Sequence, residues 1–532
     1  MRRFESSRGH YNRPAESASG GCDPTLISYI DSRSLSTEPL PFTEVVLRGI
    51  APGGGLFVPE RVPSLDWPEF KTLASLPYWR RVGRLFDRFE PDILSKRVLA
   101  IAKKAYGANF RHEDVAVVRD LGDRRFILEL WHGPTLAFKD MALQCMPLFF
   151  SEAVEQARSK GQDNSEYLVL VATSGDTGVA ALSGFADRSH TKIAVCYPDG
   201  GVSSMQRLQM VTQPGGNLMV FAVKGDFDAC QKCVKDVFND NGFGEELLAR
   251  HGLRLSSANS INWGRLLPQI VYYVSAYADM VERGRVAMGE PIDVCVPSGN
   301  FGNLLAAYYA KRMGTPIERL LCASNANNVL ADFLSTGRYE IGARHLVKTA
   351  SPSMDILVSS NLERLLYELT GNGSQVRTWM QDLSHTGGFA LDEVTFARLR
   401  RDFVGDWVDN ETSVATIGQV YRERKYLMDP HTAVAWQVAD RHAGRAPMLV
   451  VSPAHWSKFP ADVLWGLSGE RPGVPLHEDE QALFARVEHL APGQPVPSVM
   501  REICMRPVRF KRRIDGDRQA LEQGIRDWLE SA

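Results

Sequence analysis

The stretch EYLVLVATSGDTGVAALSGFA, residues 166–186, decides the fold class of this chain. It begins with a continuous apolar run, which is typical of a β-strand buried on both faces. The run breaks at Gly175 and Gly178, and helical spacing of apolar residues follows. The stretch therefore predicts a strand, a glycine loop and a helix in immediate succession.

The same arrangement recurs along the chain. PIDVCVPSGNFGNLLAAYYAKRM, residues 291–313, repeats strand, glycine loop and helix, and KIAVCYPDGG, residues 192–201, indicates another buried strand that leads into a loop. Strands that alternate with helices favour an α/β fold with largely parallel sheets and right-handed crossovers. LTGNGSQ, residues 369–375, and SHTGGFALDE, residues 384–393, indicate loops around a helical insertion.

Composition and charge indicate a globular chain of several domains. With 532 residues, about two to four domains are expected. Hydrophobic residues make up 44% and charged residues 23%, and 61 Lys and Arg against 63 Asp and Glu give a net charge of −2. This balance gives no reason to expect nucleic acid or an anionic membrane as a partner. The basic run MRPVRFKRR, residues 505–513, is followed by acidic residues and is typical of a solvated terminal face.

The chain divides into three parts by its sequence. Residues 1–28 are polar, lack the apolar core of a secretory signal, and contain Glu5 and Glu16, which argue against an organellar transit peptide; we expect a disordered leader. No apolar run approaches the roughly 18 residues that span a bilayer. We further expect an N-terminal unit over 29–120 and an α/β catalytic region over 121–532, with a smaller subdomain over about 135–225.

The cysteines predict neither a disulfide framework nor a metal site. Eight cysteines in 532 residues are too few for disulfide scaffolding, so we expect a reducing, cytoplasmic compartment. Cys230 and Cys233 form a C-x-x-C pair, but no second pair or histidine ligands stand nearby. Because the pair lies in a stretch with helical apolar spacing, helix packing is the favoured interpretation. No HExxH or calcium-loop motif is present, and we expect no metal.

Two glycine loops are candidates for binding anions. SGNFGN, residues 298–303, follows a predicted strand and opens a helix, where backbone N–H groups converge on an anion. It matches neither GxGxxG nor the Walker loop, and tight-turn geometry explains it equally well. TSGDTG, residues 173–178, adds Ser174 and Thr177 hydroxyls that could hold a carboxylate or phosphate. A plain helix N-cap remains an equal alternative.

Lys139 is the candidate catalytic residue. In WHGPTLAFKDMALQ, residues 131–144, it stands among apolar neighbours at a turn that opens a helix. Burial lowers the pKa of a lysine and favours the neutral amine, which attacks carbonyl groups. A desolvated lysine near phosphate-binding loops is what a pyridoxal phosphate site requires.

Seven motifs in order carry a family resemblance: LWHGPTLAFKD, TSGDTG, SSANSINWGRLLPQ, VPSGNFGN, SPSMDI, DPHTAVA and AHWSKF. Together with PFTEVVLRGIAPGGGLFVPE near the start, the chain closely resembles threonine synthase of the fungal and bacterial branch, over roughly Tyr29 to Pro460. The resemblance implies the tryptophan-synthase-β-like fold, called fold type II, of pyridoxal 5'-phosphate enzymes.

The resemblance also implies roles for individual residues. Lys139 would be the Schiff-base lysine, and Phe138 would pack near the cofactor ring. The implied cofactor-binding loop comprises Gly299, Asn300, Phe301, Gly302 and Asn303. The loop implied to hold the substrate carboxylate comprises Ser174, Gly175, Asp176 and Thr177. The residues implied to face the substrate phosphate are Asn259, Ser260, Asn262 and Arg265.

The chain departs from the family pattern near its last motif. Where the family has a threonine whose hydroxyl lies near the pyridine nitrogen, this chain has Pro453, which has neither a polar side chain nor an N–H. Either Ser452 takes over that contact or the nitrogen lacks it. Trp456 and Ser457 replace a usual Pro-Ala. His132 and His455 lie in family motifs, and for each a turn-stabilising hydrogen bond is at least as good an interpretation as a contact with cofactor or substrate. His431 in DPHTAVA is expected to shape a helix start.

The implied reaction is that of threonine synthase: O-phospho-L-homoserine and water give L-threonine and phosphate, with Lys139 as general base. One alternative is a diverged lyase of the same fold that acts on a related amino acid, suggested by Pro453. A second is a catalytically idle binding or regulatory subunit. A nicotinamide-dependent dehydrogenase lacks support, because no GxGxxG follows a predicted strand. The expected partner is a small amino-acid phosphate ester, and the chain would be a monomer or homodimer.

Overall fold

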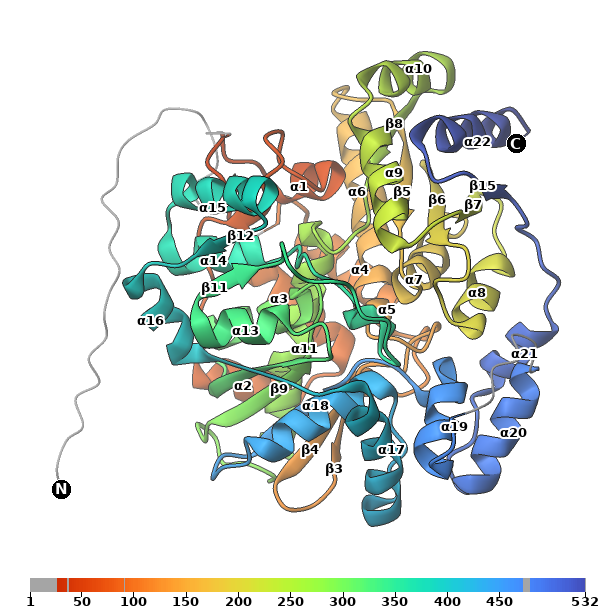
Figure 1. Cartoon of the computed structure of the whole chain (residues 1–532). Helices are drawn as coiled ribbons and strands as arrows, with labels where there is room; N and C mark the ends of the chain where they lie inside the picture. Colours follow the sequence, from red (N-terminus) through yellow and green to blue (C-terminus); the bar gives the residue numbers. More distant parts are fainter. Residues whose placement is uncertain (1–25, 36–37, 90, 472–478, 532) are drawn as a thin grey trace.

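Two large sheets with helices around them form the framework of the molecule (Figure 1). The structure is a computed structural model that describes residues 26–35, 38–89, 91–471 and 479–531. Neighbouring strands in both sheets run parallel, apart from one antiparallel pair at an edge. This confirms the α/β class predicted from the alternation of strands and helices.

The larger sheet has six strands in the order β13-β10-β9-β14-β4-β3. The antiparallel pair is the edge hairpin of β3 and β4. The strands are β3 (Val117–Asp120), β4 (Arg125–Glu129), β9 (Ile292–Pro297), β10 (Ile317–Ser324), β13 (Phe403–Trp407) and β14 (Met448–Ser452). All six residues of β9 are buried, as its continuous apolar run predicts.

The smaller sheet has five parallel strands in the order β15-β7-β6-β5-β8. The strands are β5 (Glu166–Ala172), β6 (Thr191–Pro198), β7 (Leu218–Val223), β8 (Leu253–Ser256) and β15 (Arg513–Ile514). Two of these strands lie outside the 135–225 range expected for a smaller subdomain. β15 comes from the C-terminal end of the chain and pairs with β7. A strand of two residues has no recognisable sequence pattern, so this long-range pairing could not be predicted from the sequence.

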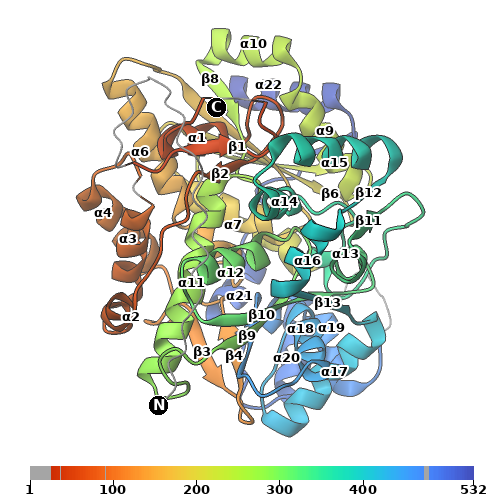
Figure 2. The same cartoon turned by 90° about the vertical axis from the view of Figure 1, so that its left-hand side faces the viewer.

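Helices cover both sheets, and α11 lies buried along most of its length between neighbouring helices (Figures 1 and 2). The helices up to α11 are α1 (Phe42–Arg48), α2 (Trp67–Ala74), α3 (Tyr78–Arg88), α4 (Ser95–Tyr106), α5 (Lys139–Leu143), α6 (Met146–Ser159), α7 (Asp176–Phe185), α8 (Ser204–Val211), α9 (Phe227–Phe238), α10 (Asn241–His251) and α11 (Trp263–Glu282). The later helices are α12 (Gly302–Arg312), α13 (Val329–Thr336), η1 (Pro352–Met354), α14 (Leu362–Thr370), α15 (Gly373–Thr386), α16 (Glu393–Asp402), α17 (Asn410–Arg424), α18 (Pro430–Arg441), η2 (Trp456–Lys458), α19 (Pro460–Ser468), α20 (Glu480–Leu490), α21 (Ser498–Met505) and α22 (Arg518–Ser531).

The N-terminal segment packs into the same core as the α/β region. The pair β1 (Tyr29–Asp31) and β2 (Phe57–Pro59) is antiparallel, and a second small pair joins β11 (Arg338–Glu340) to β12 (Gly388–Ala390). One hydrophobic cluster runs from Ile27 to Val451 without a break between the two regions. The expected boundary between 120 and 121 falls inside the β3–β4 hairpin, because this hairpin completes the larger sheet. Most of the expected leader, residues 1–25, lies outside the described residues.

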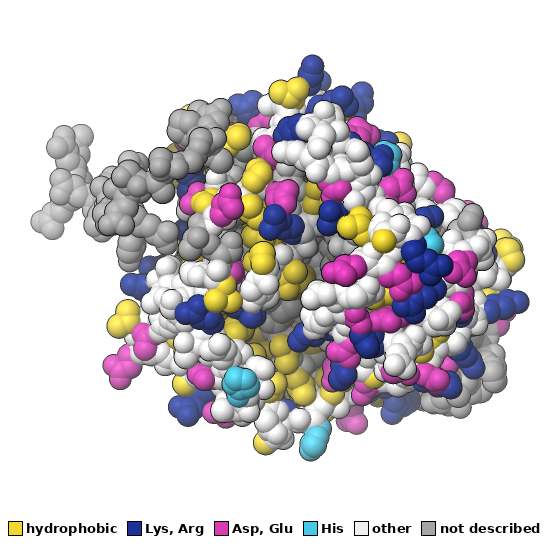
Figure 3. All heavy atoms as spheres, turned by 90° about the horizontal axis from the view of Figure 1, so that it is seen from above, with side chains coloured by type: hydrophobic (Ala, Val, Ile, Leu, Met, Phe, Trp, Pro, Cys, Tyr) yellow, Lys and Arg dark blue, Asp and Glu magenta, His cyan; other side chains and the backbone are white. Residues whose placement is uncertain are grey.

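The described cysteines are free thiols, and Cys230 and Cys233 are buried where α9 packs on the smaller sheet. This confirms the helix-packing interpretation of the C-x-x-C pair. Among the described residues no helix is long and apolar enough to cross a membrane. Basic and acidic side chains are interspersed over the face drawn in Figure 3, which agrees with the net charge of −2.

Candidate active site

A cleft lies between the two sheets at the carboxyl ends of β5, β9 and β14, where α/β folds commonly bind ligands. Both predicted glycine loops and the candidate lysine meet there. The residues that line it are Phe138, Lys139, Ser174, Asp176, Thr177, Ser260, Arg265, Gln269, Pro297, Ser298, Gly299, Asn300, Phe301, Gly302, Asn303, Ser353, Met354, His431, Pro453 and Ala454.

The loop of residues 298–303 joins β9 to α12 and forms one wall of the cleft. Phe301, the residue before the helix, has a left-handed backbone with φ 62°, and its side chain does not cap the helix. The first N–H groups of α12 therefore point to the cleft without a side-chain partner. A Cβ on Gly299 would lie 2.9 Å from the carbonyl oxygen of Ser353, so this position requires glycine. Such a loop has the geometry of an anion site.

Asn303 is oriented by two buried tyrosines of α11. The hydroxyls of Tyr272 and Tyr273 donate hydrogen bonds to Asn303 Oδ1 at 2.5 and 2.6 Å. With the carbonyl oxygen fixed in this way, Asn303 Nδ2 is buried and has no partner among the described residues. An amide nitrogen has two N–H donors, so an acceptor in the cleft would satisfy it.

Lys139 begins α5, and backbone hydrogen bonds to the end of β14 hold the segment before it. The N–H of Phe138 donates to the carbonyl of Pro453 at 2.6 Å, and the N–H of His455 donates to the carbonyl of Leu136 at 3.0 Å. Leu136 has a left-handed backbone with φ 64°, which turns the chain into the helix. Lys139 is only 9% exposed.

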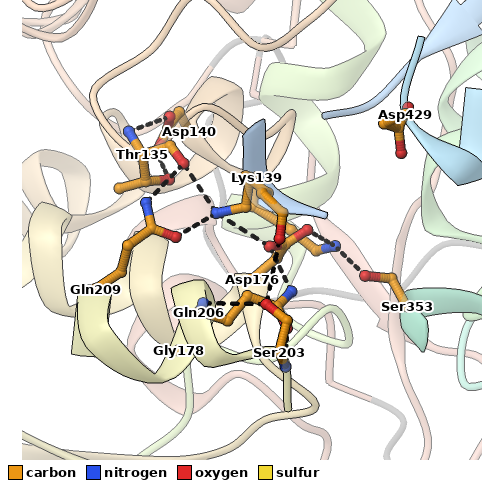
Figure 4. A network of polar contacts seen from close by, with 12 residues as sticks. Thr135, Lys139, Asp140, Asp176, Gly178, Ser203, Gln206, Gln209, Ser353 and Asp429 are labelled. Atoms are coloured by element: carbon orange, nitrogen blue, oxygen red, sulfur yellow. Dashed lines mark hydrogen bonds and ion pairs between the residues drawn. The ribbon is translucent and has the colours of Figure 1, made fainter. Parts of the chain in front are cut away.

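The amine of Lys139 has few and long contacts. Its Nζ lies 3.5 Å from Asp176 Oδ2 and 3.4 Å from Ser353 Oγ (Figure 4). The same nitrogen lies 4.7 Å from the ring centre of Phe138. Burial lowers the pKa of this amine; Asp176 opposes the shift, and the charges of Arg265 and Lys458 add to it. The environment therefore favours a neutral amine, as the apolar sequence around Lys139 predicts.

Four further polar residues line the cleft, namely Ser174, Thr177, Ser260 and Arg265. Arg265 is buried, and its Nη1 donates to the carbonyl of Ala258 at 3.1 Å. Its Nε has no hydrogen-bond partner among the described residues, and burial lowers its pKa to about 10. A buried guanidinium with an unused donor is suited to an incoming anion.

Four residues of the predicted site are not on the cleft wall. Gly175 precedes α7 with φ 131°, where only glycine fits beside the Gln206 side chain. Asn262 caps α11, and its amide holds the carbonyls of Val46 and Ser257. Asn259 and Ser452 are the other two. Ser452 Oγ lies 3.0 Å from Trp131 Nε1 and 3.0 Å from Thr432 Oγ1, so its hydroxyl is engaged behind the wall that Pro453 forms.

Of the three histidines in family motifs, His132 and His455 make local hydrogen bonds, whereas His431 also lines the cleft. His132 Nε2 lies 2.9 Å from Glu129 Oε2, and His455 Nδ1 accepts from the N–H of Ser457 at 3.2 Å, both local contacts. His431 starts α18 but also lines the cleft. Its Nε2 accepts from the N–H of Ser353 at 3.2 Å, so its Nδ1 carries the proton and donates to Asp429.

Ser353 and Lys458 are site residues that reasoning from the sequence did not single out, and for His431 it indicated only a helix start. Lys458 is fully buried and its ammonium lies 3.2 Å from Asp176 Oδ1. All three residues lie in family motifs, namely SPSMDI, DPHTAVA and AHWSKF. Their presence in those motifs was the available signal, but their roles depend on contacts with distant parts of the chain.

Comparison with known proteins gives the family. The profile described as pyridoxal-phosphate dependent enzyme matches residues 115–452, and that described as threonine synthase N terminus matches residues 28–106. Threonine synthase of Pseudomonas aeruginosa is 37% identical over 467 residues, which cover 86% of this chain and 94% of that protein. The chain belongs to the threonine synthase family. Pyridoxal phosphate is the cofactor of this family of enzymes, in agreement with the expectation from the sequence.

A second group of relatives has higher identity over a shorter share of its own length. Threonine synthase-like 1 of Homo sapiens is 43% identical over 436 residues, which cover 80% of this chain and 58% of that protein. The chain thus spans 58% of the length of these relatives.

Solved threonine synthase structures have the same architecture. The pyridoxal-phosphate-bound enzyme of Brucella melitensis has a TM-score of 0.80 and 34% identity, covering 94% of this chain and 99% of that one. The yeast enzyme has a TM-score of 0.82 and 31% identity, covering 95% and 99%. The expected fold type II architecture of a threonine synthase is therefore confirmed.

The residues of the cleft fit the cofactor. The uncapped start of α12 and the unpartnered Asn303 Nδ2 offer donors for its phosphate, and Gly299 keeps that wall open. Phe138, Met354 and Pro453 give apolar walls for an aromatic ring. Lys139 supplies a buried amine that can condense with its aldehyde.

Proposed function

We propose that this chain converts O-phospho-L-homoserine and water into L-threonine and phosphate. The observation that carries the proposal is the presence of two sets of anion-binding groups in one cleft with a buried lysine. One set is the loop of residues 298–303, and the other comprises Arg265, Ser174 and Thr177. A substrate with its own phosphate and carboxylate needs a second arrangement besides the one that holds the cofactor.

Under this proposal the residues 299–303 hold the cofactor phosphate, and Phe138 packs against its ring. When bound, pyridoxal phosphate withdraws electrons from the substrate carbon that carries the amine, which stabilises the charge left by a departing proton. Ser174, Thr177 and the amides of their loop bind the substrate carboxylate. This division of roles is based on the chemistry of the residues that line the cleft.

Lys139 and Arg265 supply the proton transfer and the charge stabilisation. Because burial lowers its pKa, the Lys139 amine can accept the protons that leave the substrate Cα and Cβ and return protons to Cγ and Cα as threonine forms. Arg265, with its unused Nε donor, and Ser260 are suited to stabilise the charge that develops on the leaving phosphate. Water then adds at Cβ.

The test is an assay of the purified full chain, loaded with cofactor, with O-phospho-L-homoserine in water enriched in oxygen-18. We expect phosphate and threonine in equal amounts, and one heavy oxygen in the threonine hydroxyl. The Lys139→Ala variant is the matched control and should form neither product. Loaded wild-type enzyme that forms no threonine from this substrate would overturn the proposal.

A second candidate is a diverged lyase of the same fold. Two observations favour it: Pro453 stands in the cleft wall where the family pattern has threonine, and the threonine synthase-like 1 proteins are more identical to this chain than the Pseudomonas enzyme is. Phosphate release without threonine, or turnover of another phosphorylated amino acid such as O-phospho-L-serine, would support this candidate.

A further inference from the structure

Two buried lysines from distant parts of the chain share one carboxylate. Asp176, at the start of α7, has Lys139 on one oxygen and Lys458 on the other. Asp176 is itself buried, and Gln206 Nε2 donates to its Oδ1 at 2.8 Å (Figure 4). Burial alone would raise the pKa of Asp176, but Lys458 and Lys139 together hold it well below its usual range. The carboxylate is therefore ionised.

The two lysines differ in how completely their donors are used. Lys458 Nζ lies 2.6 Å from Gln209 Oε1, 2.9 Å from the carbonyl of Thr135 and 3.2 Å from Asp176 Oδ1. An ammonium group has three N–H donors, and these three acceptors match them. Lys139 Nζ has only the contacts at 3.4 and 3.5 Å and otherwise faces the cleft.

A second buried carboxylate, Asp140, lies near Lys458, but both of its oxygens accept hydrogen bonds from Thr135. Asp176 is the carboxylate that contacts both lysines, and a single negative charge cannot compensate two ammonium groups. Arg265 adds a third buried cation to the same cleft. A buried charge without a counter-charge is strongly disfavoured, so the more weakly bound lysine gives up its proton. That lysine is Lys139.

We propose that Lys458 is a positioning residue that occupies Asp176 as its counter-ion and thereby keeps Lys139 a neutral amine in the cleft. This inference rests on the part of the proposed function in which Lys139 bonds to the cofactor, and not on the identity of the substrate. It accounts for a fully buried lysine that is not among the residues lining the cleft.

The test measures how the reactivity of the Lys139 amine toward pyridoxal phosphate depends on pH, and it does not rely on turnover. Full-chain protein freed of cofactor is mixed with dilute pyridoxal phosphate, bonds are fixed with borohydride at timed intervals, and the labelled Lys139 peptide is quantified by mass spectrometry over a range of pH. In Lys458→Met, Asp176 would pair with Lys139 alone and favour its ammonium form. We expect the pH midpoint of labelling to move upward by about one pH unit or more.

Gln209→Met is the matched control, because it removes one acceptor of Lys458 and leaves the charge in place. Its midpoint should stay close to that of the wild type. A Lys458→Met variant that labels more slowly at every pH with an unchanged midpoint would show a purely structural role and overturn the inference.

A second measurement covers the case in which Lys458→Met does not fold. Wild-type protein labelled with carbon-13 at the lysine ε position reports the protonation of the amines, and the Lys139 signal is identified by its loss in Lys139→Ala. We expect a neutral amine at Lys139 near neutral pH; an ammonium there would overturn the inference. A wild-type chain that bonds the cofactor at Lys139 but forms no threonine would contradict the proposed function alone.

Discussion

The backbone N–H of Phe138 donates a 2.6 Å hydrogen bond to the carbonyl of Pro453. This contact fixes the residue before Lys139 to the end of β14, and it uses a main-chain oxygen that any residue supplies. The replacement of the family threonine by proline therefore leaves the anchoring of the lysine segment intact. What the proline removes is a hydroxyl at the cleft wall, while Ser452 next to it is turned behind that wall.

Ser452→Ala is expected to lower stability more than catalysis. Its hydroxyl lies within hydrogen-bond distance of Trp131 Nε1 and Thr432 Oγ1, both at 3.0 Å, and the loss of a buried partner costs about 1–3 kcal/mol. Denaturant unfolding should detect this loss, with kcat falling by less than about threefold. A large fall in kcat with unchanged stability would instead mean that the hydroxyl reaches the cofactor nitrogen.

Tyr272 and Tyr273 orient Asn303 but do not line the cleft themselves, and we expect their replacement to weaken cofactor binding. In the double variant Tyr272→Phe, Tyr273→Phe, Asn303 Oδ1 loses both donors, so its amide is no longer held with Nδ2 toward the phosphate wall. We expect the Kd for pyridoxal phosphate to rise about tenfold, measured by fluorescence or calorimetry. Tyr277→Phe on the same helix, whose hydroxyl contacts Glu290 and Gly289, is the control. Equal affinities in both variants would refute the orienting role.

Gly299→Ala tests the close approach of the glycine loop to η1. The new Cβ would lie 2.9 Å from the Ser353 carbonyl oxygen and 3.1 Å from Met354 Cα, both main-chain atoms that cannot turn aside. We expect cofactor affinity to fall at least tenfold, because the loop or η1 must shift. Gly244→Ala, in α10 with open space around it, should raise stability by up to about 1 kcal/mol. Normal cofactor binding by Gly299→Ala would show that the loop is more pliable than the contact implies.

His455 predicts an acid-dependent loss of stability. Burial lowers the pKa of His455 from 6.5 to about 3. The folded state therefore favours the neutral ring. The contribution of His455 to the free energy of unfolding is full above about pH 6.5 and is lost as the pH falls toward 3. At pH 5 the loss is about 2 kcal/mol. His455→Asn, which can still accept from the Ser457 N–H, should remove this share of the pH dependence in denaturant unfolding. An identical dependence in both proteins would contradict the assignment.

The elements predicted with success are those whose evidence is local. The continuous apolar runs of β5 and β9 and the glycines that follow them predicted both strands and both loops. Lys139 was predicted from its apolar neighbours, and its pKa is indeed lowered by burial.

The parts that the sequence did not predict depend on long-range contacts. β15 joins the smaller sheet from the end of the chain, and Lys458 reaches Asp176 only when η2 and α7 are brought together. Ser452 was a reasonable substitute for the missing threonine because it is the adjacent hydroxyl. Ser452 is the last residue of β14, however, and its hydroxyl contacts Trp131 and Thr432, whereas Pro453, just after the strand, lines the cleft. The assigned substrate roles of residues 174–177 and of Arg265 stay predictions.

The central claim is that Lys139 carries the cofactor, and its most direct test is a map of the covalent bond. The full chain is incubated with pyridoxal phosphate, reduced with borohydride, digested and analysed by tandem mass spectrometry. We predict a phosphopyridoxyl group on Lys139 and its absence from the Lys139→Ala variant. A reduced label on Lys458 or on a surface lysine, with Lys139 unmodified, would contradict the account.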